Sequence, residues 1–450
     1  MLIPSAATAA PPRYREAVEL QSGSAFPIFL LALYFIVEYV RPSFLESFRP
    51  AIVLQSVILL MLLVNLQKVF AVLKEKYFFL YLLLLFEMVI HVPIATNNRW
   101  ALYGLIPMVT YFIISVSFCV FVDQLEKLKI LISALIVMLA LCAFAGALTA
   151  GAFFRGKGYM GDSNDFALMM NVMIPIAFFM GLASRGAKRA LYWATVPIFV
   201  AANVVSLSRG GFVGMAAVAL VCWYYSKSRV KSLIICLFVL VAFAALIPHR
   251  YFEEMQTIET EGADSGTGRE RIELWKIATR VFIYNPLIGI GQSNLPWVME
   301  GYQNLNDGYW KRGVGGRVTH SIYFTVLPEL GIVGFTLWGL IFLNAASKYR
   351  EISRARFLER DEVAESEYSS LNYIMLGLFV GLVGYLVSGI FLSVFYYPQF
   401  WNLTGIMTAG YRIFENQISS ARRDSPLKAN QSSVGHGARR TTARLATRSV

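Results

Sequence analysis

The chain has 450 residues, of which 57% are hydrophobic and only 15% are charged. This composition is far more apolar than that of an ordinary globular protein, which argues against a soluble enzyme. The formal net charge of +12 would suggest nucleic acid as the partner of a soluble chain. Here most Lys and Arg residues fall in short loops between apolar blocks and in the C-terminal tail, where such charges set membrane topology, so no nucleic-acid partner is expected.

Long apolar blocks recur along the chain, and several approach the roughly 20 residues that are needed to cross a hydrocarbon core. They predict an all-α polytopic membrane protein with about 12 transmembrane helices and one large external loop. The predicted spans are 25–40, 51–65, 77–94, 101–122, 129–148, 162–183, 190–207, 209–225, 231–247, 320–346, 371–395 and 398–414.

The basic loops predict the orientation. With the N-terminus in the cytoplasm, the segments from Lys68 to Lys76, Arg185 to Arg189, Lys227 to Lys231 and Lys348 to Arg360 all lie on the cytoplasmic side. The positive-inside rule then holds at each of these loops. With about 12 spans the C-terminus is cytoplasmic as well.

This topology divides the chain into four regions. Residues 1–247 hold about nine spans, residues 248–319 form the large external loop, residues 320–414 hold about three spans, and residues 415–450 form a disordered basic tail. An amphipathic helix is expected in the loop from Arg269 to about Tyr284. Its Ile272, Trp275, Thr279 and Phe282 recur at helical spacing.

The stretch from Ser206 to Gly211, with the sequence SLSRGG, is placed in a tight external turn between the seventh and eighth spans. Arg209 would then lie at the membrane boundary. A guanidinium fork matches phosphate oxygens, and flanking glycines let backbone N–H groups approach an anion, so this turn is a candidate site for a lipid-linked phosphate. An interfacial arginine beside a tight turn explains the same residues.

Arg269 and Arg271 fall in the first turn of the expected loop helix, where cations oppose the helix dipole. This placement favours an anionic partner, although Glu270 and Glu273 offer local neutralisation as an alternative. Arg271 and Trp275 share one helix face, and Arg269 does not share it.

His320 stands where the external loop re-enters the membrane. A neutral imidazole there could accept a proton from a hydroxyl nucleophile, whereas a packed or interfacial histidine is the alternative. Asp162 and Asp165 at the start of the sixth span are interpreted as helix caps, with acceptor binding as the alternative. Aromatic rings crowd the loop and suit sugar faces, packing or the membrane interface; they are Trp275, Trp297, Tyr302, Tyr309 and Trp310.

No Walker A, HExxH or Asp-x-Asp pattern occurs in the sequence, so neither a metal nor a nucleotide cofactor is expected.

Three motifs, in this order, resemble the bacterial O-antigen ligase and O-antigen polymerase superfamily. They are SLSRGG at 206–211, GTGRERIELW at 266–275 with NPLIGIG at 285–291, and THSIYFTVLPELGIVGF at 319–335. The resemblance covers roughly residues 160–345. It implies a C-type membrane glycosyltransferase that takes a glycan from undecaprenyl diphosphate without metal or nucleotide, at the periplasmic face of the bacterial inner membrane.

Carried over by local motif, the family's membrane-boundary arginine is Arg209, the arginine four residues before the loop tryptophan is Arg271, and the histidine at the loop exit is His320. The resemblance implies that Arg209 and Arg271, with Arg269 as a further candidate, bind the lipid diphosphate. His320 and Arg271 are the expected catalytic residues. The expected partners are an undecaprenyl-diphosphate-linked glycan donor, a lipid or glycan acceptor, and membrane lipids.

The motifs serve both a ligase, which moves finished polymer onto lipid A-core or a similar acceptor, and a polymerase, which extends lipid-linked repeat units. The single large loop favours the ligase reading, whereas the spacing of Arg280 and Gly291 resembles one proposed for polymerases. A protein O-oligosaccharyltransferase is a third enzyme option. A transporter or flippase would be expected to show repeated halves and midplane charges, which the sequence does not suggest.

Overall fold

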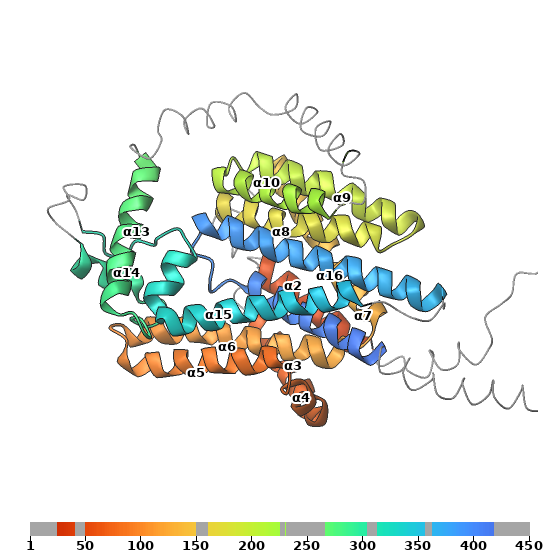
Figure 1. Cartoon of the computed structure of the whole chain (residues 1–450), viewed down its shortest axis with the longest axis horizontal. Coiled ribbons are helices and arrows are strands. Elements are labelled where there is room, and N and C mark those ends of the chain that lie inside the picture. The colour runs from red at the N-terminus through yellow and green to blue at the C-terminus, as the bar shows by residue number, and fades with distance from the viewer. Residues whose placement is uncertain are drawn as a thin grey trace, which may run out of the picture.

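The computed structural model describes residues 25–40, 50–149, 161–225, 230, 266–303, 313–355 and 362–417. Within these ranges the regular secondary structure is helical, which agrees with the all-α prediction. Most of the helices run side by side along the length of the molecule, and α13 (Gly266–Tyr284) lies across one end of them (Figure 1).

The first half of the described chain supplies the elements α2 (Phe26–Phe35), η1 (Ile36–Val40), α3 (Pro50–Val64), α4 (Leu66–Val72), α5 (Lys76–Ile94), α6 (Asn98–Phe121), α7 (Leu125–Leu148), α8 (Ser163–Leu182), α9 (Gly186–Val205) and α10 (Arg209–Tyr224). The second half supplies α13, α14 (Leu295–Val298), η5 (Met299–Tyr302), α15 (Tyr323–Arg354), α16 (Glu362–Ser388), η7 (Gly389–Phe391) and a last helix over residues 398–417.

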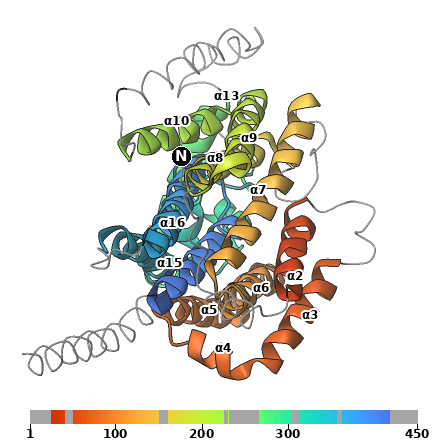
Figure 2. The same ribbon diagram turned by 90° about the vertical axis from the view of Figure 1, so that its right-hand side faces the viewer.

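Two groups of helices form the bundle. Seen along the helices, α8, α9 and α10 lie on one side, α5 and α6 lie on the other, and α7 runs between the two groups (Figure 2). Helix α16 packs on α8 and α10, while α15 packs on α5. Helices of this length suit a membrane, because 24 residues at 1.5 Å per residue extend about 36 Å.

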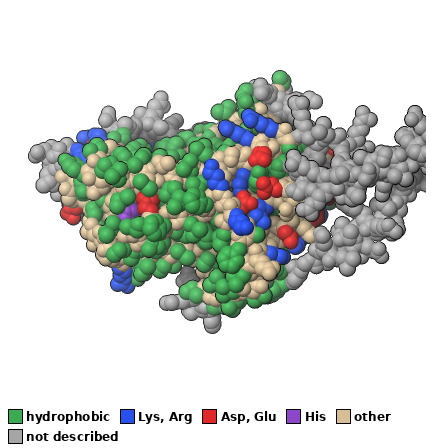
Figure 3. All heavy atoms as spheres, turned by 60° about the horizontal axis from the view of Figure 1, so that its bottom comes forward, with side chains coloured by type: hydrophobic (Ala, Val, Ile, Leu, Met, Phe, Trp, Pro, Cys, Tyr) green, Lys and Arg blue, Asp and Glu red, His purple; other side chains and the backbone are tan. Residues whose placement is uncertain are grey.

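The number of spans remains partly a prediction. Six described helices are long and apolar enough to cross a membrane, or seven if α3 and α4, which are bent by 94°, form one broken span. Phe26–Val40 and α10 are shorter apolar helices. Helices are present at eleven of the twelve predicted spans, whereas span 231–247 lies outside the described residues. On one face, hydrophobic side chains cover the middle and charged side chains gather toward one end (Figure 3).

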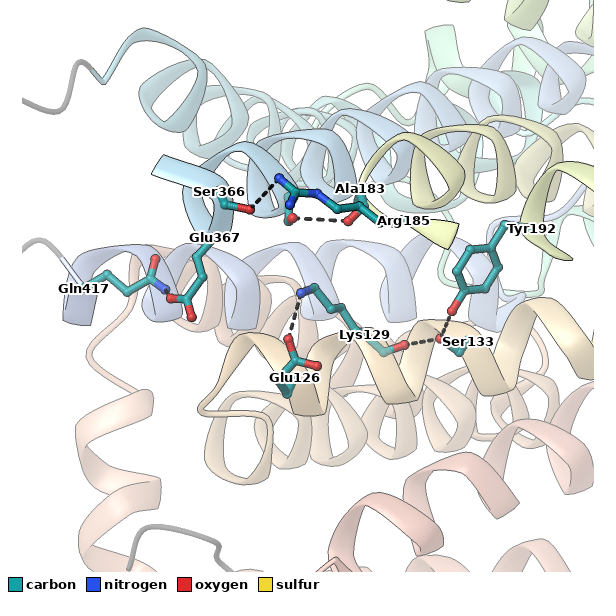
Figure 4. A network of polar contacts seen from close by, with 10 residues as sticks. Glu126, Lys129, Ser133, Ala183, Arg185, Tyr192, Ser366, Glu367 and Gln417 are labelled. Carbon is teal, nitrogen blue, oxygen red and sulfur yellow. Dashed lines mark hydrogen bonds and ion pairs between the residues drawn. The ribbon is translucent and has the colours of Figure 1, made fainter. Parts of the chain in front are cut away.

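The bundle therefore has two distinct ends. The site end holds α13, α14 and the first residues of α8, α10 and α15. The opposite end holds the first residues of α5, α7, α9 and α16 together with residue 417. At the opposite end, Lys129 contacts Glu126 within α7, and Arg185 at the start of α9 donates a hydrogen bond to Ser366 of α16 (Figure 4). The last helix continues through residue 417, and the rest of the predicted basic tail lies outside the described residues.

Candidate functional site

The turn between α9 and α10 fixes the start of α10 through hydrogen bonds. Ser208 caps the helix because its Oγ accepts a hydrogen bond from the Gly211 N–H (2.9 Å) and donates one to Asn164 Oδ1 (2.7 Å). Leu207 has a positive φ of +56°, as a sharp reversal requires. Arg209 follows as the first residue of α10 and is partly buried. The predicted tight turn is confirmed, and its side of the membrane stays a prediction.

Helices α8 and α10 approach each other closely behind this turn. A Cβ on Gly211 would lie 2.4 Å from the Ala167 Cβ, so only glycine allows this contact. Asn171 of α8 donates a hydrogen bond to the Gly211 carbonyl (2.8 Å) and accepts one from the Asn203 side chain of α9 (2.8 Å). Buried amide groups thus hold the first turn of α10, and with it Arg209, in one position.

Helix α13 has the predicted extent, but its buried face differs from the predicted one. The buried side chains are Leu274, Ile277, Ala278 and Val281, whereas the expected Ile272, Trp275, Thr279 and Phe282 are only partly buried or exposed. The reason is a separate small core outside the main bundle, in which the first set packs with Leu295, Met299 and Val314. The helix has two sets of apolar residues at helical spacing. The sequence did not reveal which of the two sets Leu295, Met299 and Val314 would cover.

Trp275 has another role, because it connects α13 to the segment that carries His320. Its Nε1–H donates a hydrogen bond to the Thr319 carbonyl (2.8 Å), and its ring stacks on Phe324 with ring centroids 4.9 Å apart. An ion pair between Glu270 and Arg317 forms a second link between α13 and this segment. The face that Arg271 and Trp275 share is therefore turned toward the residues around His320.

His320 projects from a tightly held backbone. Its neighbours Thr319, Ser321 and Ile322 are buried, yet His320 itself is exposed. The Ile322 N–H donates a hydrogen bond to the Gly389 carbonyl (2.8 Å), and Thr319 Oγ1 lies 2.9 Å from Thr325 Oγ1. The φ of His320 is +50°, an unfavourable value for a residue with a Cβ, and such strained residues cluster at functional sites. An exposed imidazole on a fixed backbone is available to a ligand.

Electrostatic interactions show that the three predicted residues gather at one place. Burial lowers the pKa of Arg271, and the nearby Arg209 lowers it further, while Asp162 and Glu270 oppose this. The protein atoms around the partly exposed His320 desolvate it and lower its pKa, the charge of Arg271 adds to this, and Asp162 and Glu270 raise it. Arg209 of α10, Arg271 of α13 and His320 therefore share one charged cluster that is assembled from three remote segments. We call these residues, with Asp162, the Arg-His cluster.

Asp162 is the member of this cluster for which the sequence favoured helix capping over a functional role. Its predicted capping role is confirmed, because it is the N-cap of α8 and accepts a hydrogen bond from the Asn164 N–H (2.7 Å). It also acts electrostatically on both Arg271 and His320. More than a hundred residues separate Asp162 from Arg271, so no local spacing could have revealed this proximity. Asp165 instead accepts a hydrogen bond from the Tyr397 hydroxyl (2.9 Å).

The motif NPLIGIG pairs with a break in α15. Gly331 has φ +60° and ψ −165°, which interrupts the helix three residues after Pro328. Across this break the N–H groups of Ile290 and Gly291 donate to the carbonyls of Pro328 and Glu329 (3.1 and 2.8 Å). The N–H groups of Ile332 and Val333 donate to the carbonyls of Pro286 and Leu287 (2.9 and 3.1 Å). The loop and the membrane helix thus form one backbone unit.

Glu329 stabilises the same region. This buried carboxylate accepts hydrogen bonds from the N–H groups of Ser293 (2.9 Å) and Leu295 (3.1 Å) and from the Tyr396 hydroxyl. It fixes the segment between NPLIGIG and α14 and is not a hydrogen-bond partner of His320.

The other predicted residues are Arg269, Arg280, Tyr309 and Trp310. Arg269 has an exposed side chain, and its predicted role in binding the lipid diphosphate stays a prediction. Arg280 donates a hydrogen bond to the Tyr302 carbonyl (3.4 Å). Tyr309 and Trp310 lie outside the described residues. Within the described ranges, no three His, Cys, Asp or Glu side chains gather in a way that could hold a metal ion.

Fold and site together define a polytopic membrane protein with a charged cluster at the end of its helix bundle. Residues 194–339 match the family model described as O-antigen ligase. This match confirms the resemblance of the chain to the O-antigen ligase and polymerase superfamily. No curated protein matches the chain. The matched residues include Arg209, Arg271 and His320, and the matched family indicates a glycosyltransferase-like membrane enzyme.

Proposed function

We propose that the protein is an O-antigen ligase-type glycosyltransferase that moves a glycan from undecaprenyl diphosphate to an acceptor hydroxyl on lipid A-core or a similar molecule. The observation that carries this proposal is the gathering of Arg209, Arg271 and His320 within the O-antigen ligase domain. Two guanidinium groups close to each other repel, and an anion between them relieves this repulsion. A diphosphate supplies such an anion.

In the proposed reaction, the acceptor oxygen attacks the anomeric carbon of the sugar that is attached to the diphosphate. The bond between that carbon and the diphosphate oxygen breaks, and the electron pair leaves with undecaprenyl diphosphate. Arg209 and Arg271 stabilise the charge that grows on the departing diphosphate. His320 accepts the proton of the acceptor hydroxyl. Because its pKa is lowered, the imidazole is neutral at pH 7 and can act as a base. The reaction needs no metal in this scheme.

The proposed location is the bacterial inner membrane, with both termini in the cytoplasm and the site end in the periplasm. This assignment rests on the positive-inside rule and on the family's lipid-linked glycan substrates.

Transfer by purified protein in detergent tests the enzymatic proposal. A radiolabelled polyprenyl-diphosphate glycan and a purified lipid A-core acceptor should yield labelled product with the wild type. His320→Ala should lower the rate by about 10²–10⁴-fold, as expected when a general base is lost. His436→Ala, in the predicted disordered tail, is the matched control and should keep full activity. Near-wild-type transfer by folded His320→Ala protein would reject the general-base role.

A deletion strain separates the ligase from the polymerase. Loss of a ligase leaves full-length polymer on undecaprenyl diphosphate, whereas loss of a polymerase leaves single repeat units on the acceptor. Gel and mass analysis of surface and lipid-linked glycans distinguishes these results. Single repeat units on the acceptor would reject the ligase assignment in favour of the second candidate, an O-antigen or exopolysaccharide polymerase. A protein O-oligosaccharyltransferase would instead leave a protein without its glycan.

The alternative that is not an enzyme is a polytopic transporter or flippase. It would translocate lipid-linked sugars across vesicle membranes and would show no glycosyl transfer in detergent solution. The position of the Arg-His cluster at one end of the bundle supports transfer over translocation, because transporters bind their substrates near the middle of the membrane.

A further inference from the structure

A cavity of about 430 Å³ lies at the site end, lined by residues of α6, α14, α15 and the segment before His320. Its volume falls in the range of pockets that bind small ligands, roughly 300–1,000 Å³. Thr319, which directly precedes His320, lines the cavity together with Thr325 and Ser393. His320 thus adjoins this cavity through Thr319 and adjoins the arginines through its interaction with Arg271.

The mouth of the cavity carries two tryptophan side chains. Trp100 of α6 and Trp297 of α14 both line it, with ring centroids 6.0 Å apart and ring planes tilted by 40°. They are 45% and 51% exposed, so neither is a core residue. Indole rings combine a broad apolar surface with a polar N–H, which suits the apolar face and the hydroxyl rim of a sugar ring.

The polar groups of the cavity are hydroxyls and one carboxyl group. Thr319 Oγ1 lies 2.9 Å from Thr325 Oγ1 and 3.3 Å from Ser393 Oγ, so the three hydroxyls form one connected group. Such groups both donate and accept hydrogen bonds, as sugar hydroxyls do. The carboxyl group of Glu329 completes the lining.

The charges in this cavity differ from those of the Arg-His cluster. None of the described residues that line the cavity is Lys or Arg, so the lining offers no cation to a phosphate or a uronic acid. Buried anions need cationic or hydrogen-bonding partners. The lining therefore favours an uncharged ligand.

We propose that this cavity binds an uncharged sugar ring of the acceptor and presents one of its hydroxyls to His320. The inference rests on the proposed transferase function for the identity of the acceptor. In this proposal the arginines bind the diphosphate of the donor and the cavity binds the neutral sugar of the acceptor. His320, the general base, lies between the two binding sites.

Fluorine NMR of the full chain in detergent tests sugar binding without any need for transfer. In protein labelled with 5-fluorotryptophan, Trp100→Phe and Trp297→Phe identify the two cavity resonances. Methyl glycosides of glucose, galactose and mannose should shift these two resonances, while glucose 6-phosphate and methyl glucuronide should not. Trp193, which is 41% exposed at the opposite end, is the matched control and should not respond.

A kinetic measurement then links the cavity to the acceptor. Trp297→Ala should raise the acceptor KM by about tenfold and leave the donor KM unchanged, since one aromatic contact is lost. Trp193→Ala should change neither constant. Sugar-induced shifts in a protein that shows no transfer would reject the proposed function and keep the sugar site. Shifts with the charged sugars alone, no shift with any sugar, or unchanged kinetics in Trp297→Ala would overturn the inference.

Discussion

The two ends of the helix bundle differ in how their charged side chains are arranged and in how much backbone strain they contain. At the opposite end, basic groups pair with acidic ones, as Lys348 and Arg412 both do with Glu75 (3.3 and 2.9 Å). At the site end, Arg209 and Arg271 lie close enough to repel each other. Ion pairs such as those of Glu75 stabilise the fold, whereas two arginines that are held near each other at a fixed place suit an anionic ligand.

The backbone shows the same contrast. The non-glycine residues with positive φ in the described ranges are Leu207, Ser293 and His320, and all three lie at the site end. Each such residue costs of order 1–3 kcal/mol, so the rest of the fold must hold it in place. The hydrogen bonds around Ser208, Glu329 and Ile322 provide that support. The site end has strained residues at the positions where the proposed chemistry occurs.

The largest expected effect compares one arginine from each end. Arg271→Ala should lower transfer by about 10²–10³-fold, as the loss of one preorganised donor to a developing anion does. Arg412→Ala removes an arginine of the opposite end and should leave transfer within about threefold, because a partly exposed ion pair contributes little. Initial rates of radiolabelled transfer by both purified variants measure the difference.

Size-exclusion profiles that match the wild type serve as the control for folding in both variants. Equal losses in the two variants would contradict the distinction between the ends. Transfer by Arg271→Ala within a few-fold of the wild type would remove this arginine from the proposed diphosphate site.

A second prediction compares two glycines that both have a positive φ. Gly331 has φ +60°, and an added Cβ would lie 2.2 Å from the Leu287 carbonyl oxygen. Gly316 has φ +78° and nothing within 4 Å of its Cβ position. Gly331→Ala should therefore prevent the pairing of NPLIGIG with α15 and cost about 3 kcal/mol or more, while Gly316→Ala costs only about 1 kcal/mol of backbone strain.

Thermal unfolding of the two purified variants in detergent checks this expectation through the difference in Tm. Equal Tm values would mean that the loop and the break in α15 separate without cost, and the two motifs would then not form one unit.

The sequence predicted most helices of the bundle but only part of the site. Apolar runs placed α5 and α6, and the turn residues placed Arg209, because those signals are local. The buried face of α13 and the double role of Asp162 were not predictable. Each depends on which distant segment covers a residue, and the spacing of residues along the chain carries no such information. The cavity was missed for the same reason, because Trp100, Trp297 and Thr319 meet only in the folded chain.

The smallest expected effect is a pH shift that distinguishes the neighbours of His320. Burial and Arg271 hold the pKa of His320 below its usual 6.5, so the base stays neutral and active at lower pH, and the acid limb of kcat/KM should lie below pH 6.5. Arg271→Gln removes a cation and should raise that pKa, which moves the acid limb upward. Asp162→Asn removes an anion and should lower the pKa, which moves the limb downward. We expect each shift to be about one pH unit or less.

Asp162→Asn removes one charge with almost no change in shape, and Arg271→Gln removes one charge of the opposite sign with a shorter side chain, so each is the control for the other. Glu75→Gln removes an anion at the opposite end and should leave the acid limb in place, because its partners Lys348 and Arg412 lie far from His320 along the bundle. Because Arg271 and Asp162 carry opposite charges, a general disturbance of the site would move both limbs the same way. Opposite movements, measured as kcat/KM against pH at constant ionic strength, would instead tie the titrating group to the Arg-His cluster. Movements of both limbs in the same direction would mean that the titrating group is not His320, and the proposed role of His320 in proton transfer would be rejected.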